Sequence, residues 1–273
     1  MNPYLIDAHS HLQFPQYEAD REEVIKRMFD KNIWTICAGS NSISSEWGIA
    51  LAERFEKGIY ATVGIHPSHS TETDEPLEVD GGYDKFDYEK MLALASRKKV
   101  VGIGEFGFEF FDDKKTLDDQ RILFDLHLDL ANEVKKPVVI HCRNGYEETL
   151  DALYANREKL LPEAGIMHFY SGDKEYARKF LDLGFSFTFG GALTLPKKAD
   201  GADFAEALAY LPQDRILFET DAPYVAPKKY RGQRNEPAFV EEVLLKASEV
   251  LQVPADVLAK SSVENTLRVF NLI

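Results

Sequence analysis

The stretch YLIDAHSHL, residues 4–12, decides how this 273-residue chain is interpreted. It begins with an apolar run, as expected for a buried strand, and leads directly into His9 and His11. Side chains two residues apart on a strand point to the same side, so both imidazoles can reach one point in space. The combination of an apolar run with a histidine or acidic residue at its end recurs along the chain.

Eight short runs of this kind alternate with stretches of helical spacing. The runs are residues 4–7, 33–38, 59–65, 100–105, 137–141, 165–169, 185–189 and 215–220. Between them, apolar residues such as Ile122, Leu123 and Leu126 share one predicted helix face. Strands that alternate with helices pair in parallel, and eight such units close a (β/α)8 TIM barrel of the α/β class. No glycine-rich dinucleotide fingerprint follows the first run, which disfavours an open doubly wound sheet.

Length and composition are compatible with one barrel domain over residues 1–273. About 250 residues is typical of such a barrel, and 44% of the residues are apolar. The first residues lack the basic and apolar regions of a signal peptide, and no apolar run approaches the ~20 residues that span a bilayer. We therefore expect a soluble, cytoplasmic protein without membrane contact, and a monomer.

The charge balance limits the kinds of partner. There are 32 basic and 46 acidic residues, a net charge of −14, which argues against broad contacts with duplex phosphates. A small basic mouth that takes a strand end is still compatible with this total. The two cysteines, Cys37 and Cys142, lie inside strand-like runs, and we expect both to be buried, reduced thiols.

Potential metal ligands gather at the ends of the predicted strands. The histidines concerned are His9, His11, His66, His69, His141 and His168, and the acidic residues are Glu105 and Asp221. Only His127 of the seven histidines falls inside a predicted helix, where an ordinary structural role is expected. In a barrel of this kind the strand C-termini open on one rim, so residues 9 to 221 can converge there.

The residue types favour divalent metal ions. One strand histidine alone is more often a satisfied buried residue than a ligand, but a set at successive strand ends is difficult to explain by packing. Imidazole with carboxylate suits zinc, manganese or iron, whereas magnesium, which stays a candidate, usually prefers more oxygen ligands. The ligands exceed what one open site needs. Two ions about 3.5–4 Å apart that share Glu105 would explain the surplus, polarise a bridging water into hydroxide and clamp a phosphoryl or carbonyl oxygen.

A basic segment follows the eighth run. It reads KKYRGQR, residues 228–234, and loops after strands 7 and 8 often bind phosphate in these barrels. Arginine suits bidentate phosphate contacts, so we predict that role for Arg231 and Arg234, with Arg143 as a third candidate. Lys228 and Lys229 fit a solvated loop equally well. Two long loops, residues 66–86 and 190–203, are placed on the same face.

The ordered motifs resemble the TatD family of metal-dependent deoxyribonucleases, within the amidohydrolase-type barrels. They are DAHSHL (7–12), GIHP (64–67), GEFG (104–107), PVVIHCR (137–143), HFYSG (168–172), ETDAPY (219–224), RGQRNEP (231–237) and NTLRVF (265–270). The resemblance implies two divalent ions held by His9, His11, Glu105, His141, His168 and Asp221. It also implies phosphodiester hydrolysis at nucleic-acid ends, often as a 3′-to-5′ exonuclease. Asp221 would orient or deprotonate the nucleophilic water, and Glu219 would support the ligands from behind.

The chain departs from the family pattern at positions expected to face substrate. Glu109 stands where an aspartate is common, Phe110 near a usual tyrosine, and Ser68 where a second histidine is usual. Phe169 and Tyr170 stand where Cys-Phe is usual. His66 and His69 are further candidates for substrate contact.

Three functions are compared on these residues. A metal-dependent nuclease is favoured by the basic segment and by Glu105. Related barrels that hydrolyse small amides, esters or lactones often bridge their metals with a carbamylated lysine, whereas the fourth run of this chain ends in Glu105 and offers no lysine. That small-molecule hydrolase is the alternative. A non-catalytic metal-binding scaffold is the third, and it is disfavoured because the ligand set is complete.

Overall fold

The computed structural model describes residues 3–70, 84–110, 116–196 and 203–272. Within them, eight parallel strands pair in sequence order from β1 to β8 and form a nearly closed barrel. The strands are β1 (Leu5–Ser10), β2 (Ile33–Cys37), β3 (Ile59–Val63), β4 (Val100–Glu109), β5 (Val138–Arg143), β6 (Gly165–Met167), β7 (Phe185–Phe189) and β8 (Ile216–Phe218). Each lies on one of the eight predicted runs, so the predicted (β/α)8 barrel is confirmed.

The seam between the first and last strands is closed by the residues that follow β8. Ser10 forms a parallel bridge with Ala222, and the His11 amide donates to the Ala222 carbonyl at 2.7 Å. The buried Asp7 carboxylate accepts from the Thr220 amide at 2.8 Å and from the Thr220 hydroxyl at 2.6 Å. These bonds fix the segment after β8 beside the end of β1.

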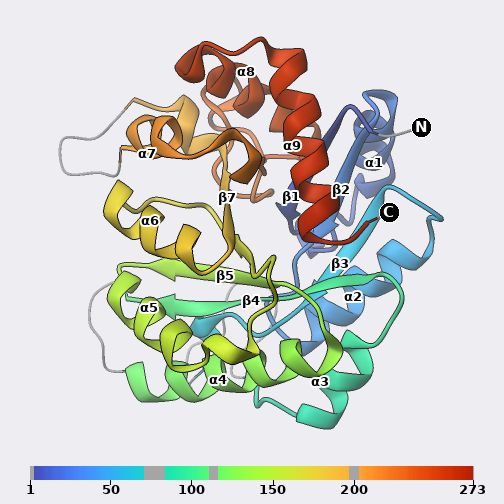
Figure 1. Cartoon of the computed structure of the whole chain (residues 1–273). Helices are drawn as coiled ribbons and strands as arrows, with labels where there is room; N and C mark the ends of the chain where they lie inside the picture. Colours follow the sequence, from blue (N-terminus) through green and yellow to red (C-terminus); the bar gives the residue numbers. More distant parts are fainter. Residues whose placement is uncertain (1–2, 71–83, 111–115, 197–202, 273) are drawn as a thin grey trace.

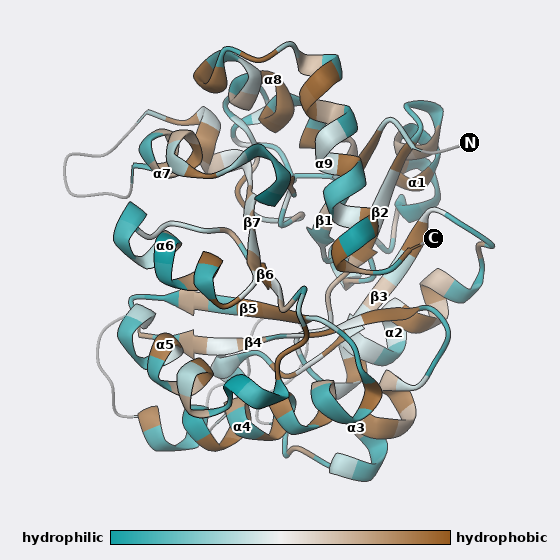
Figure 2. Cartoon of the chain, viewed as in Figure 1, coloured by the Kyte–Doolittle hydropathy of each residue, from teal (hydrophilic) through white to brown (hydrophobic). Residues whose placement is uncertain are grey.

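Helices lie around the outside of the strands (Figure 1). They are α1 (Arg21–Asp30), α2 (Ser42–Glu53), α3 (Tyr88–Ala95), α4 (Leu117–Val134), α5 (Tyr146–Ala155), α6 (Lys174–Asp182), α7 (Phe204–Tyr210), α8 (Val240–Leu251) and α9 (Ala255–Val269). Figure 2 shows apolar strands and helices that are apolar on one side. In α4, Leu123 is buried as predicted, but Ile122 is 62% exposed, so its placement on the buried face was wrong. Adjacent helical residues differ by about 100° in direction, so Ile122 points away from the stripe that holds Leu123 and Leu130.

An apolar cluster fills the barrel beneath its C-terminal rim. It takes one residue from each of six strands and also includes Val269, the last residue of α9, and Phe270 directly after it. The strand members are Ala8, Ile36, Val101, Val139, Ile166 and Leu217. Residues from strands all around the barrel can meet in this way only in its interior. Since alternate residues of a strand share one side, His141, His168 and Glu219 also point inward, two positions after Val139, Ile166 and Leu217.

Two further expectations can be compared with the fold. Cys37 and Cys142 are free and buried, as predicted. The central parts of the two long loops, residues 71–83 and 197–202, lie outside the described residues. Within the described part of the chain, no helix is both long and apolar enough to cross a membrane.

Candidate metal centre

Six side chains from five strands, or from the residues that follow them, meet at the rim of the barrel. His9 lies in β1, His11 directly follows it, Glu105 lies in β4, His141 in β5, and His168 follows β6. Asp221 follows β8, where its amide donates to the His9 carbonyl at 2.9 Å. We call these six residues the rim cluster.

The Glu105 carboxylate lies among the four histidines of the rim cluster. Its Oε2 is 3.4 Å from His9 Nε2, 3.6 Å from His168 Nε2 and 3.9 Å from His141 Nδ1. Its other oxygen, Oε1, is 3.7 Å from His11 Nε2. The two oxygens therefore face different histidines, as a carboxylate that bridges two ions would.

Asp221 completes the opposite side of the rim cluster. Its Oδ1 is 3.4 Å from His11 Nε2, 3.9 Å from His9 Nε2 and 4.0 Å from His168 Nε2. The donors thus form two neighbouring groups that could each hold an ion: His9 with His11 and Asp221, and Glu105 with His141 and His168.

The spacing of the donor atoms fits coordination better than direct hydrogen bonding. Ligands bound tetrahedrally at about 2.0–2.1 Å lie roughly 3.4 Å from one another. The His9 and His11 Nε2 atoms are 3.4 Å apart, and the histidine-to-carboxylate distances above are 3.4–4.0 Å. Hydrogen bonds between these groups would normally be shorter than 3.2 Å. The donor set and its spacing therefore fit a divalent metal centre.

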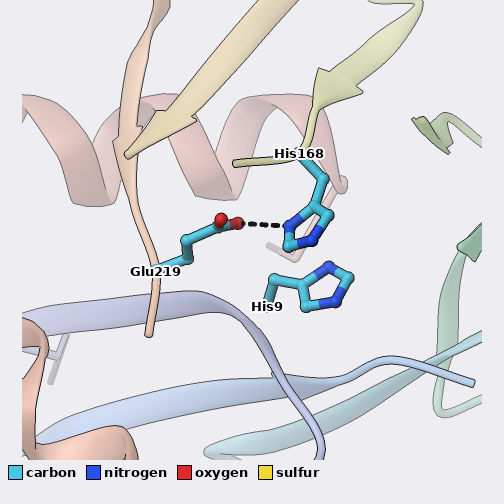
Figure 3. A group of neighbouring side chains, drawn as sticks. All are labelled: His9, His168 and Glu219. Atoms are coloured by element: carbon cyan, nitrogen blue, oxygen red, sulfur yellow. Dashed lines mark hydrogen bonds and ion pairs between the residues drawn. The ribbon is translucent and has the colours of Figure 1, made fainter. Parts of the chain in front are cut away.

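Hydrogen bonds at the far side of the imidazoles orient the free lone pairs. His11 Nδ1 is 3.0 Å from the Ala38 carbonyl, to which it can only donate, so its Nε2 carries the lone pair. His168 Nδ1 is 2.9 Å from Glu219 Oε2, and Figure 3 shows this bond at the edge of the His168 ring, with His9 below the ring. His9 and His168 stack with ring centroids 3.6 Å apart. The hydrogen bonds to Ala38 and Glu219 fix the tautomers of His11 and His168 that leave Nε2 free for metal.

The electrostatics of the rim cluster favour a cation. Burial, and then the neighbouring histidines, hold the pKa of His9 well below its usual value. Burial alone would also lower the pKa of His168, but Glu219, Glu105 and Asp221 together raise it to about 10. The carboxylates therefore stabilise a positive charge at His168, and a metal ion would compete with a proton for this site.

A second group extends the rim cluster on one side. His141 Nε2 is 2.9 Å from Glu109 Oε2, and the His66 ring lies 4.3 Å from the His141 ring. His66, Glu109 and His141 form a further set of donors close enough to share an ion. The structure thus brings His66 to the site. Glu109 was noticed in the sequence only as a family departure, since nothing showed that β4 continues past Glu105.

The other substrate candidates are more dispersed. His69 is buried in a short 3-10 helix (Pro67–His69) and belongs to none of the four donor groups of the described residues. Arg143 is exposed, with Nε 3.7 Å from Glu109. Arg231 is exposed. Arg234 donates to the Gln16 carbonyl and to Asp20, each at 2.6 Å, so its guanidinium is tied to the segment after β1.

Two buried polar residues support the site: Asp7, which was not predicted, and His127, whose predicted structural role is confirmed. Asp7 fixes Thr220 and so positions Asp221. His127 in α4 accepts from the Ile65 amide at 2.9 Å and donates to the Leu123 carbonyl at 2.7 Å, which anchors the residue before His66. Asp7 carried a signal in the sequence, because a lone acidic residue in an apolar run must find a partner.

Comparison with known proteins agrees with the motifs. The family model described as TatD related DNase matches residues 6–271. An uncharacterized metal-dependent hydrolase, YabD of Bacillus subtilis, is 32% identical over 98% of this chain and 99% of its own. A 3′-5′ ssDNA/RNA exonuclease, TatD of Pantoea ananatis, is 30% identical over 98% of this chain and 100% of its own. The crystal structure of YJJV, a TatD homolog from Escherichia coli, superposes with a TM-score of 0.86 at 29% identity and covers 99% of both chains.

Proposed function

The chain belongs to the TatD-related DNase family and is a metal-dependent hydrolase, and from this premise we propose that it cleaves phosphodiester bonds at nucleic-acid ends, as a 3′-to-5′ exonuclease. The observation that carries the proposal is the rim cluster, in which Glu105 presents one oxygen to His11 and the other to His9, His141 and His168. Two divalent ions, with zinc, manganese and magnesium as the candidates, fit this arrangement.

The residues proposed to hold the ions have distinct tasks. His9, His11 and Asp221 would hold one ion, His141 and His168 the other, and Glu105 both. When bound, two such ions lower the pKa of water and neutralise charge on a phosphodiester. His11 and His168 would bind the ions through Nε2, because their Nδ1 atoms donate elsewhere. His141 would use Nδ1, because its Nε2 lies on Glu109.

Asp221 is the proposed proton acceptor. Its side chain is 17% exposed, compared with 6% for Glu105, so it is the rim-cluster carboxylate that meets solvent and substrate. It also lines the cavity beside the rim cluster. We propose that Asp221 orients the attacking water and takes its proton, while Glu105 stays between the ions.

The basic residues are proposed to bind the nucleic-acid strand rather than to take part in the reaction itself. Arg143 lies two residues after His141 and lines the same cavity as Asp221. Arg231 stands exposed in the loop after β8 and is the better phosphate candidate of that loop, since Arg234 is engaged by Asp20. With few cations to contact phosphates, binding should depend only weakly on salt. One catalytic domain over residues 1–273, a monomeric state and a cytoplasmic location stay predictions.

The test is cleavage of an end-labelled single-stranded oligonucleotide by the wild type beside His141→Ala, with each candidate metal. We expect a ladder that shortens from the 3′ end and disappears with EDTA and in the variant. Absence of cleavage with every metal, by a protein that demonstrably holds two ions, would contradict the nuclease proposal. The small ester, amide or lactone hydrolase would then take its place.

A further inference from the structure

A cavity of about 370 Å³ opens directly beside the rim cluster. Its lining includes His141, His168 and Asp221 of the rim cluster together with the apolar side chains of Phe169, Phe204 and Val225. This volume lies in the range of small-ligand sites, which begins at about 300 Å³. A group that fills the cavity therefore lies next to whatever the rim cluster binds.

Phe169 is presented to this cavity by its backbone. It directly follows His168, its φ is +46°, and its amide donates to the Thr188 hydroxyl at 3.0 Å. A non-glycine residue rarely adopts positive φ, and the bond to Thr188 helps to hold it there. Gly190 gives the ring its room, because a Cβ at that position would lie 2.5 Å from Phe169 Cε2.

The Phe169 ring contributes little to the apolar core. Within the described residues it belongs to neither apolar cluster and stays partly exposed. Its aromatic neighbour Phe204, at the start of α7, packs against the larger cluster. The two rings are nearly perpendicular, at 88°, with centroids 6.2 Å apart. Phe204 thus supports the Phe169 ring through a T-shaped contact, and both rings line the cavity.

We propose that Phe169 is the stacking surface for the base of the terminal nucleotide whose phosphodiester lies at the rim cluster. The proposal rests on the proposed nuclease function and names the part of the substrate that this cavity takes. A base has a flat apolar face that stacks on aromatic side chains, and such stacking tolerates every base. No Asn or Gln side chain is among the described residues that line the cavity, so base edges are not read there by amide side chains.

The kinetic test compares wild type with Phe169→Leu, which keeps an apolar side chain and removes the ring. The substrates are single-stranded oligonucleotides that end in adenosine, in cytidine or in an abasic residue at the 3′ position. For the first two, we expect Phe169→Leu to raise KM about five- to hundredfold, the range for loss of one base–aromatic stack, with a much smaller change in kcat. The abasic end should bind both proteins equally weakly. Tyr210→Leu, which removes an exposed ring on the same helix as Phe204, is the matched control and should leave KM unchanged.

A binding test separates this proposal from the nuclease proposal. Metal-loaded protein is titrated with 2-aminopurine nucleoside 5′-monophosphate, whose fluorescence falls on stacking. We expect quenching by wild type and by Tyr210→Leu, and weaker binding with less quenching by Phe169→Leu. Equal binding and quenching by wild type and Phe169→Leu would overturn the stacking role.

The combined outcomes are distinct. Hydrolysis of normal and abasic ends with equal KM by both proteins refutes the stacking role and leaves the nuclease intact. Hydrolysis of no oligonucleotide, with 2-aminopurine quenching that depends on Phe169, refutes the nuclease and supports a base-binding hydrolase of nucleotides.

Discussion

Replacement of Glu219 by glutamine should weaken the binding of one metal ion while the fold and the ligands stay in place. Glu219 is fully buried, and its Oε2 accepts from His168 Nδ1 at 2.9 Å (Figure 3). The carboxylate fixes the tautomer of His168 and makes its Nε2 more basic toward a cation. Glutamine keeps the shape of the side chain and can still accept through its amide oxygen, but it carries no charge.

The magnitude follows from the kind of bond that is changed. A hydrogen bond to a charged group contributes about 1.5–3 kcal/mol and a neutral one about 0.5–1.5 kcal/mol. Their difference of about 1–1.5 kcal/mol corresponds to roughly a tenfold weaker metal affinity. Glu219→Ala also leaves the Nδ1 donor without its acceptor, so we expect a loss near the upper end of the ~10–100-fold range for such partners.

The assay is competition with a chromophoric chelator, which gives the affinity of each ion. The affinity for one ion should fall in the order wild type, Glu219→Gln, Glu219→Ala, while the affinity for the other ion changes little. Glu163→Gln, at a carboxylate that pairs with Arg215 near the protein surface, is the control. Unchanged affinity for both ions in Glu219→Ala would refute the assignment of His168 as a ligand supported by Glu219.

Three further predictions concern stability and substrate binding. Removal of metal with EDTA should lower Tm by about 5–10 °C in calorimetry, since ligand at 100 times its Kd adds about 2.7 kcal/mol; an unchanged Tm would exclude a folded-state metal site. Arg231→Ala should raise KM for an oligonucleotide and reduce the salt slope by about one, whereas Arg234→Ala, which removes the ion pair with Asp20, should mainly lower stability by up to about 1 kcal/mol. Equal KM values for wild type and Arg231→Ala would remove the phosphate role. Burial lowers the pKa of His127 to about 3, below its unfolded value near 6.5. The contribution of His127 to the free energy of unfolding should therefore be fully present above pH ~6.5 and decline toward pH ~3 by up to about 1.4 kcal/mol per pH unit. His127→Leu should remove that part of the slope and cost about 1–3 kcal/mol at neutral pH in urea unfolding, because the Ile65 amide loses its acceptor; an unaltered pH profile would show that another group is responsible.

The barrel could be predicted because its strands are buried on both faces and therefore read as continuous apolar runs. Helix faces were less certain. Helix α2 has three buried serines, Ser42, Ser44 and Ser45, which hide its inner face from a hydrophobic pattern. The strand ends also shifted, because β4 continues to Glu109 through pairing with β5 that the local sequence does not encode.

The convergence of the rim cluster was predictable, but the polar contacts behind it were not. Strand ends in a barrel share a rim, so the positions of His141 and His168 followed from the topology. The pairing of Asp7 with Thr220 crosses 213 positions, and that of Arg234 with Asp20 crosses 214. Such contacts depend on how the strands close and how loops pack, which neither motifs nor periodicity report. For this reason Arg234 could be assigned to phosphate in the sequence although it is held by Asp20 in the fold.

Anomalous diffraction from crystals of the wild-type protein grown with manganese or zinc would test the proposed two-ion centre. We predict two peaks about 3.5–4 Å apart inside the rim cluster, with one oxygen of Glu105 directed to each. A single peak, or two peaks that Glu105 does not join, would contradict the account.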